Sequence, residues 1–184
     1  RRKNIAKAKV FSRKDNPTPE ILVQRAKMKA VVQLSRSLLP IIRKGFAGVG
    51  NGTTSNAFVA RNMKAVTVDE KNVGTIDFDL LQVAAGMLNP PKVTVNYDEE
   101  SKKFQFVQEM QEEEDGYAFA GDQVYGVLYE TVRERARLIT LRVRGEGGST
   151  SYALPDEWDN TKVKAYCFAT LDNGKMASDS LLIS

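Results

Sequence analysis

The sequence predicts an α+β protein in which a basic, helical N-terminal part precedes an antiparallel β-sandwich. Three observations predict this class. Residues 1–64 hold 15 of the 27 Lys and Arg but only 2 of the 23 Asp and Glu, so they carry a net +13 and the remainder −9. Apolar residues recur at helical spacing before residue 64, and they alternate with polar residues after residue 75.

Residues 1–16 are expected to form a basic extended arm. Ile5, Val10 and Phe11 are its only large apolar groups, too few to hold it as an independent element. The arm therefore needs a partner surface. The predicted organisation is an extended arm over 1–16, a helical segment over 17–72 and a β-sandwich domain over 73–184.

A helix is predicted to begin at Pro19. Thr18 is placed to cap the free amides, Pro19 suits the first helical position, and Glu20 is favourable in the first turn. The apolar stripe continues until Pro40, which is expected to end or kink the helix before a short second helical stretch. Another short helix is predicted from residue 53 or 54 to about 64.

From residue 75 onward, short runs in which apolar and polar residues alternate are typical of strands with one solvent-exposed face. Turn signals separate them, and Asp172-Asn173-Gly174 predicts a closing hairpin. About seven short strands over ~110 residues indicate an immunoglobulin-like antiparallel β-sandwich. The predicted strands are residues 75–80, 92–97, 103–108, 123–130, 138–143, 161–170 and 180–183.

Composition excludes several kinds of chemistry. The chain has no His, which removes Ser-His-Asp and Cys-His catalysis within one chain and the usual zinc sites. The lone Cys167 excludes an intrachain disulfide, and its apolar neighbours predict a buried, inert thiol. No stretch approaches the roughly 20 apolar residues of a membrane-spanning helix. We predict no enzymatic activity, no cofactor and no metal site.

Some local patterns have both a chemical and a structural interpretation, and we favour the structural one. The acidic residues 112–115 lack the alternating spacing of a calcium loop, so they indicate a solvated turn. Asp77 and Asp79 fit the wet face of a strand better than a catalytic pair. Trp158 is predicted to cover one end of the sandwich core, and Tyr166 to be structural, like the corner tyrosine of immunoglobulin-like sandwiches.

The glycine-rich run 145–148 also has two interpretations. It follows a predicted strand, as a phosphate loop does, but the residues after it read as another strand rather than a helix. The run is therefore predicted to be a turn.

The N-terminal motifs resemble those of one family. Asn16-Pro17-Thr18-Pro19, Gln24-Arg25-Ala26-Lys27 and the segment LLPIIRKGF at residues 38–46 resemble a Bacteroidota family catalogued as a domain of unknown function. The resemblance implies a Leu-Pro helix and a C-terminal sandwich, but no assigned activity. It also implies a glycine-rich start, which is missing here, and we expect an upstream segment because the first residue is not Met. By analogy with prophage-associated proteins that share the helix-start motif, the resemblance favours a phage or phage-like particle.

The charge split supports two functions. In the first, the arm and the first helix dock on the acidic sandwich of a neighbour, making a non-enzymatic structural protein that assembles into homo- or hetero-oligomers. In the second, the same segment neutralises nucleic-acid phosphates independently of sequence. We favour assembly. We expect the protein to be synthesised in the cytoplasm and incorporated into a particle, and the sequence leaves secretion open. The candidate partner-binding residues are Arg1, Arg2, Lys3, Lys7, Lys9, Val10, Phe11, Arg13, Lys14, Arg25 and Lys29.

Overall fold

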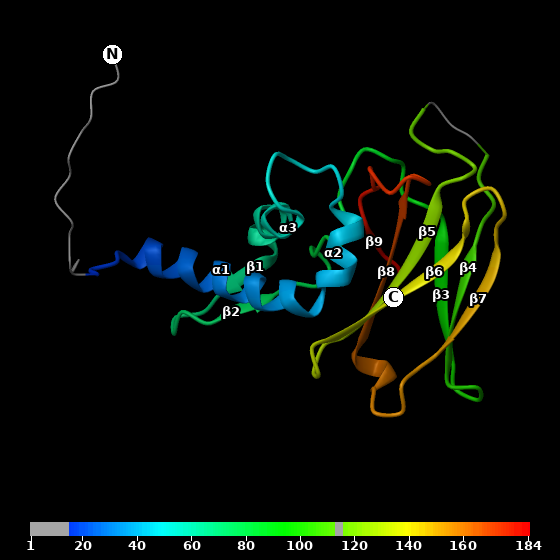
Figure 1. Ribbon diagram of the computed structural model, residues 1–184. Helices are drawn as coiled ribbons and strands as arrows, with labels where there is room; N and C mark the ends of the chain where they lie inside the picture. The colour runs from blue at the N-terminus through cyan, green and yellow to red at the C-terminus, as the bar shows by residue number, and fades with distance from the viewer. Residues whose placement is uncertain (1–14, 113–115) are drawn as a thin grey trace, which may run out of the picture.

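The structure is a computed structural model that describes residues 15–112 and 116–184. Within these residues, three α-helices and several antiparallel sheets confirm the predicted mixed α+β class. Figure 1 shows the helices gathered toward one end of the molecule and most strands toward the other. Residues 1–14 of the predicted arm and residues 113–115 of the solvated turn predicted at 112–115 lie outside the described residues.

The helical part follows the local signals of the sequence. It comprises α1 (Pro19–Ser37), α2 (Leu39–Gly45) and α3 (Thr54–Asn62), which the 3₁₀ helix η1 (Met63–Ala65) extends. Pro19 opens α1 as predicted, and the break between α1 and α2 falls at Leu38, two residues before Pro40. The predicted cap by Thr18 is wrong, because its side chain accepts no hydrogen bond from the first turn.

Strands β1 (Val66–Val68) and β2 (Gly74–Ile76) form an antiparallel hairpin beside α1. A Cβ on Gly74 would lie 3.0 Å from the carbonyl oxygen of Ala26, so glycine permits this close approach. The predicted strand at 75–80 is wrong in length, because β2 ends at Ile76. Its first residues pair with β1, which was not predicted, and residues 77–80 leave the hairpin in a turn.

The remaining strands form two antiparallel sheets. One has the order β3-β4-β7 and the other the order β6-β5-β8-β9. Their bounds are β3 (Val93–Asp98), β4 (Lys103–Gln108), β5 (Gln123–Glu130), β6 (Arg135–Val143), β7 (Gly148–Ala153), β8 (Val163–Thr170, preceded by the 3₁₀ helix η2, Asn160–Lys162) and β9 (Leu181–Leu182). The predicted hairpin through Gly174, which has a φ of 66°, brings β9 back against β8.

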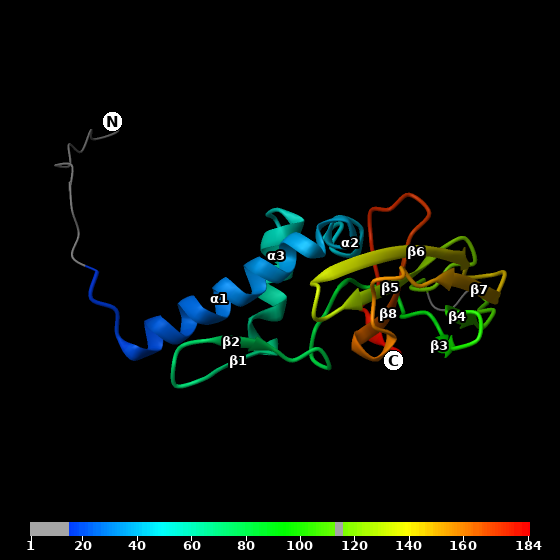
Figure 2. The ribbon, with the colours of Figure 1, turned by 90° about the horizontal axis from the view of Figure 1, so that it is seen from below.

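The four-stranded sheet lies between two apolar cores. On one face Val124 and Leu128 of β5 join a cluster shared with the three-stranded sheet, and on the other Tyr125 and Val127 join a cluster shared with the helices. Figure 2 shows the resulting layers from the helical part to the three-stranded sheet. Burial on both faces explains why β5 and β8 read as nearly continuous apolar runs.

The buried side chain of Tyr166 helps to link the two-sheet part to the segment after β2. Tyr166 is fully buried in β8, and its hydroxyl donates to the backbone carbonyl of Phe78 at 2.8 Å. Burial raises the pKa of this phenol well above its usual value. The predicted structural role is thus confirmed, although the partner lies in the segment that joins the helices to the sheets.

Candidate partner-binding surface

The structure describes two of the eleven predicted partner-binding residues, Arg25 and Lys29. The other nine, from Arg1 to Lys14, lie outside the described residues. Both described residues are exposed and lie on α1. The described part of the candidate surface is therefore a face of α1.

One face of α1 is exposed along four turns and combines apolar with basic side chains. Because residues three, four or seven apart share one face of a helix, Ile21, Arg25, Met28, Lys29 and Arg36 form one stripe. We call these five residues the outer stripe. Ile21 is 44% and Met28 55% exposed, although both are large apolar side chains. The opposite face packs inward, where Ala26, Val31 and Leu34 are buried.

The basic residues of the outer stripe differ in their partners. The guanidinium of Arg25 donates to both carboxylate oxygens of Asp15, at 2.6 and 2.9 Å. This hydrogen-bonded contact lowers the pKa of Asp15 and raises that of Arg25. Lys29 and Arg36 take part in none of the ion pairs found among the described residues. Their charges are thus available to an external partner.

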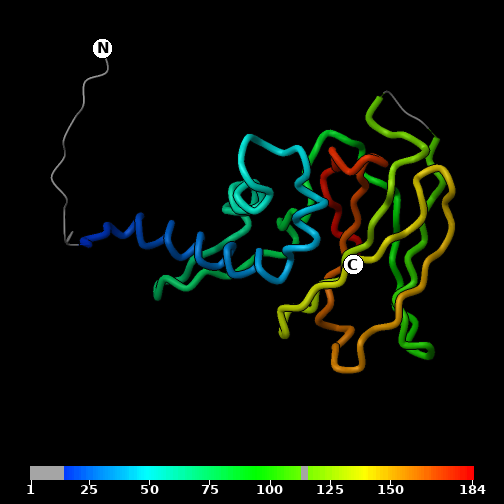
Figure 3. Tube along the Cα trace, in the orientation of Figure 1, coloured from blue at the N-terminus to red at the C-terminus, as the bar shows by residue number. Residues whose placement is uncertain are grey.

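The turn between β3 and β4 is an exposed acidic surface at the other end of the molecule. We call Asp98, Glu99 and Glu100 the acidic turn. Asp98 accepts from the Ser101 hydroxyl at 2.6 Å and from the Glu100 amide at 3.1 Å. The Ser101 hydrogen bond is the main reason that the pKa of Asp98 is lowered. Figure 3 shows the start of α1 and this turn at opposite ends of the chain trace.

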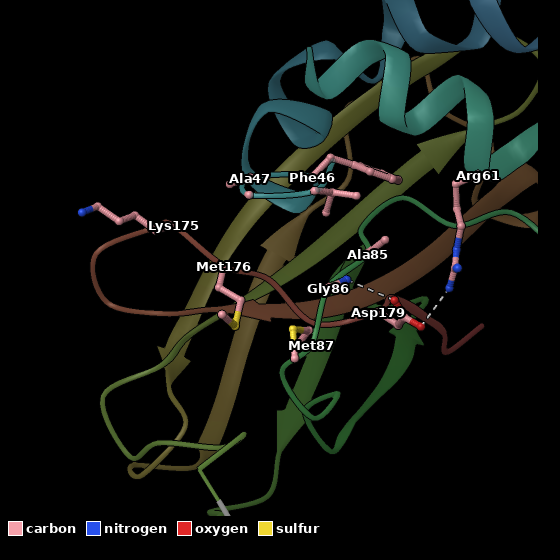
Figure 4. A pocket seen from close by; sticks show the side chains of 11 residues that line it. Phe46, Ala47, Arg61, Ala85, Gly86, Met87, Lys175, Met176 and Asp179 are labelled. Carbon is pink, nitrogen blue, oxygen red and sulfur yellow. Dashed lines mark hydrogen bonds and ion pairs between the residues drawn. The ribbon is translucent and has the colours of Figure 1, made fainter. Parts of the chain in front are cut away.

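A pocket of about 360 Å³ lies where the helical part meets the loop between β8 and β9. Figure 4 shows Arg61 beside Asp179 on one wall and Met87 and Met176 on the opposite side. One carboxylate oxygen of Asp179 accepts from Arg61 at 3.1 Å, and the other accepts from the Gly86 amide at 3.1 Å. Because both oxygens are engaged, this carboxylate holds the walls together rather than facing the pocket as a free base.

The other candidate residues, Asp77, Asp79, Trp158 and Cys167, have structural roles. Asp79 lies 3.5 Å from the Lys164 ammonium, and Asp77 accepts from the Asp79 amide, so these acids belong to a turn and not to a strand face. Trp158 is buried in the cluster between the sheets, as predicted. Cys167 is fully buried there as well, and burial raises the pKa of its thiol to about 12.

Within 15–112 and 116–184, no three side chains of the metal-binding types lie close enough together to hold an ion. No helix of the same residues has the length and apolar character needed to cross a bilayer.

The sequence interpretation missed three arginines that the structure gathers around one hollow. Arg133, Arg135 and Arg137 line it together with Trp158. The spacing of Arg135 and Arg137 was a visible signal, since residues two apart on a strand share a face, whereas Arg133 lies in the turn before β6. It was overlooked because the excess of positive charge lies in residues 1–64.

No protein-family model, curated protein or solved structure matches this chain. The function proposed below is therefore argued from the geometry of the surfaces described above.

Proposed function

We propose that the protein is a non-enzymatic structural protein that assembles through the outer stripe of α1. The observation that carries the proposal is the exposure of Ile21 and Met28 beside Lys29 and Arg36 on one helix face. Large apolar groups gathered on an exposed face mark a protein contact, and the flanking cations select an acidic partner. The basic residues of positions 1–14 extend the same charge.

The partner we propose is a second copy of the chain, bound through its acidic turn. Glu99 and Glu100 are exposed and take part in no ion pair among the described residues. Because the outer stripe and the acidic turn are different surfaces at opposite ends, their contact is head to tail (Figure 1). Such a contact repeats into a ring or a filament. A phage or phage-like particle is the setting that we propose, by analogy alone.

The immunoglobulin-like identity of the two sheets belongs to the same proposal. In chain order, β3, β4, β5, β6, β7, β8 and β9 correspond to strands A, B, C, C′, E, F and G of such a sandwich, and the two strand orders agree with this assignment. Membership of the Bacteroidota family is likewise proposed on the motifs at 16–19 and 38–46. Neither proposal assigns an activity.

Sequence-independent nucleic-acid binding is the second candidate. It is favoured by the exposure of Lys29, Arg36 and Arg43, none of which has an ion-pair partner among the described residues. Phosphates would be bound through these charges, with affinity that falls steeply with salt. This candidate assigns no role to exposed Ile21 and Met28, which is why we rank it second.

The test is sedimentation velocity of the full chain over a range of concentrations at physiological salt. We expect oligomers that weaken roughly tenfold or more with Met28→Ser or Lys29→Glu, because each removes a contact in the interface. Glu99→Lys with Glu100→Lys should weaken them similarly, and combining it with Lys29→Glu should restore association. Met110→Ser and Lys64→Glu are matched exposed controls outside both surfaces.

Two outcomes would contradict the proposal. One is a strict monomer at every concentration, and the other is equal weakening by the control variants. If the monomer instead shifts mixed-sequence DNA or RNA in a salt-dependent manner, and Lys29→Glu but not Met28→Ser weakens that shift, nucleic-acid binding replaces assembly.

A further inference from the structure

A second charged site lies at the end of the two-sheet part, independent of the outer stripe. A hollow of about 470 Å³ is bounded by Arg133, Arg135, Arg137, Glu157 and Trp158. Its volume falls within the range of small-ligand pockets. Three of its five lining residues are arginines, so its lining carries a net positive charge.

Strand β6 holds two of these arginines on one face. Side chains two apart on a strand point the same way, so Arg135 and Arg137 share a face with Ile139. Ile139 is buried in the cluster between the sheets. The arginines therefore continue the inner face of the sheet beyond the end of the apolar core, where the space between the elements opens to solvent.

Two contacts hold parts of the hollow in place. The Arg137 guanidinium lies 5.5 Å from the centre of the Trp158 ring, which is a cation–π distance. Trp158 itself is buried, so the ring fixes the guanidinium and offers little free surface to a ligand. The backbone amide of Arg133 donates to the carboxylate of buried Glu130, which holds the β5–β6 turn. One of the three guanidinium groups is thus held against a buried ring, and the backbone of a second arginine is fixed by the turn.

The three arginines lack counter-ions within the part of the chain that the structure describes. The four ion pairs found there involve other cations, and Glu157 is not within ion-pair distance of any of the three. Glu134, in the same turn, accepts hydrogen bonds from the amide of Gln33 instead. Like charges held close together repel one another, and a bound anion removes that repulsion.

We propose that this hollow binds a phosphate or sulfate group carried by a sugar. A planar guanidinium pairs with such oxyanions through two parallel N–H donors, and a tetrahedral group offers enough oxygens for three arginines. A carboxylate carries one charge and two oxygens, which suits a single arginine. The hollow also exceeds the size of one inorganic oxyanion, so room remains for a ring attached to it.

The test uses the fluorescence of Trp158, because it is the only tryptophan in the chain. The full chain is titrated at low salt with inorganic phosphate and sulfate, then with glucose 6-phosphate and AMP, which distinguish a hexose from a nucleotide source. We expect a saturable change that Arg135→Gln weakens roughly tenfold or more. Arg137→Lys retains the positive charge but removes the two parallel N–H donors of the guanidinium, so it should weaken binding as well.

Two controls separate this site from the rest of the molecule. Arg142→Gln removes an exposed arginine of the same strand that does not line the hollow, and Lys64→Glu reverses an exposed charge outside the hollow, the outer stripe and the acidic turn. Both should leave the titration unchanged. The inference is overturned if no probe changes the fluorescence up to about 10 mM, or if either control weakens binding as much as Arg135→Gln. Neither result bears on assembly through α1.

Discussion

Asp122→Ala should strongly destabilise the fold, because Asp122 is the only anion that contacts a fully buried arginine among the described residues. Arg144 has no exposed surface, and Asp122 is nearly as buried. The Arg144 guanidinium donates to Asp122 at 3.1 Å, to the Gln111 side chain at 3.0 Å and to the Asn89 carbonyl at 2.7 Å. These contacts tie the end of β6 to three loops.

The expected loss in the free energy of unfolding follows from the buried groups that Asp122→Ala leaves without a partner. Without Asp122 the guanidinium stays buried with neutral partners alone, and breaking a buried pair in this way costs about 3–5 kcal/mol. The Phe119 amide also loses its acceptor, which lies 3.0 Å away, at a cost of about 1 kcal/mol. The exposed pair of Lys164 and Asp79 is the matched control, and Asp79→Ala should cost less than about 1 kcal/mol.

The assay is urea unfolding followed by circular dichroism, with a double-mutant cycle that adds Arg144→Met. Removing both charges should cost less than the sum of the single changes by about 2 kcal/mol, because the second substitution removes the unpaired charge. Additive costs, or a loss below about 1 kcal/mol for Asp122→Ala, would refute the reasoning.

Two further predictions follow from close packing and from burial. Gly86→Ala places a Cβ 1.9 Å from the Ala177 carbonyl oxygen and should lower the free energy of unfolding by about 1–3 kcal/mol in urea titrations. Gly121→Ala, with nothing within 4 Å of its Cβ, should change it little, and equal effects would contradict the packing argument. Burial raises the pKa of Cys167 from 9.0 to about 12, so its contribution to stability is complete below pH 9.0 and is lost as pH rises toward about 12. Cys167→Ala should reduce this alkaline loss of stability, and rapid reaction of the folded thiol with a disulfide reagent at pH 8 would count against the burial.

Much of the fold was predictable where the signal is local. The breaks around Pro19 and Pro40 follow from the backbone of proline itself. The strands β4 and β5 match their predicted bounds, and β7 forms where the residues after the glycine-rich run were read as a further strand without stated bounds. It is rich in Gly, Ser and Thr, and it becomes a strand because β4 pairs with it along its whole length.

The candidate site was less predictable. The basic character of α1 was evident in the sequence, but the exposure of Met28 depends on which face the β1–β2 hairpin covers. Likewise, the pairing of Arg25 with Asp15 joins residues ten positions apart. Burial of Arg144 was not predictable either, since its partners come from loops between 22 and 55 residues away.

The sequence by itself determined the separation of charge, the absence of histidine chemistry and the order of helices before strands. Composition and contacts within about four residues are enough to set these properties. Only the tertiary structure decided that β5 and β8 are covered on both faces, and that Arg135 and Arg137 meet Trp158 in one hollow. These outcomes depend on contacts between distant segments, whose pairing no fixed spacing in the chain encodes.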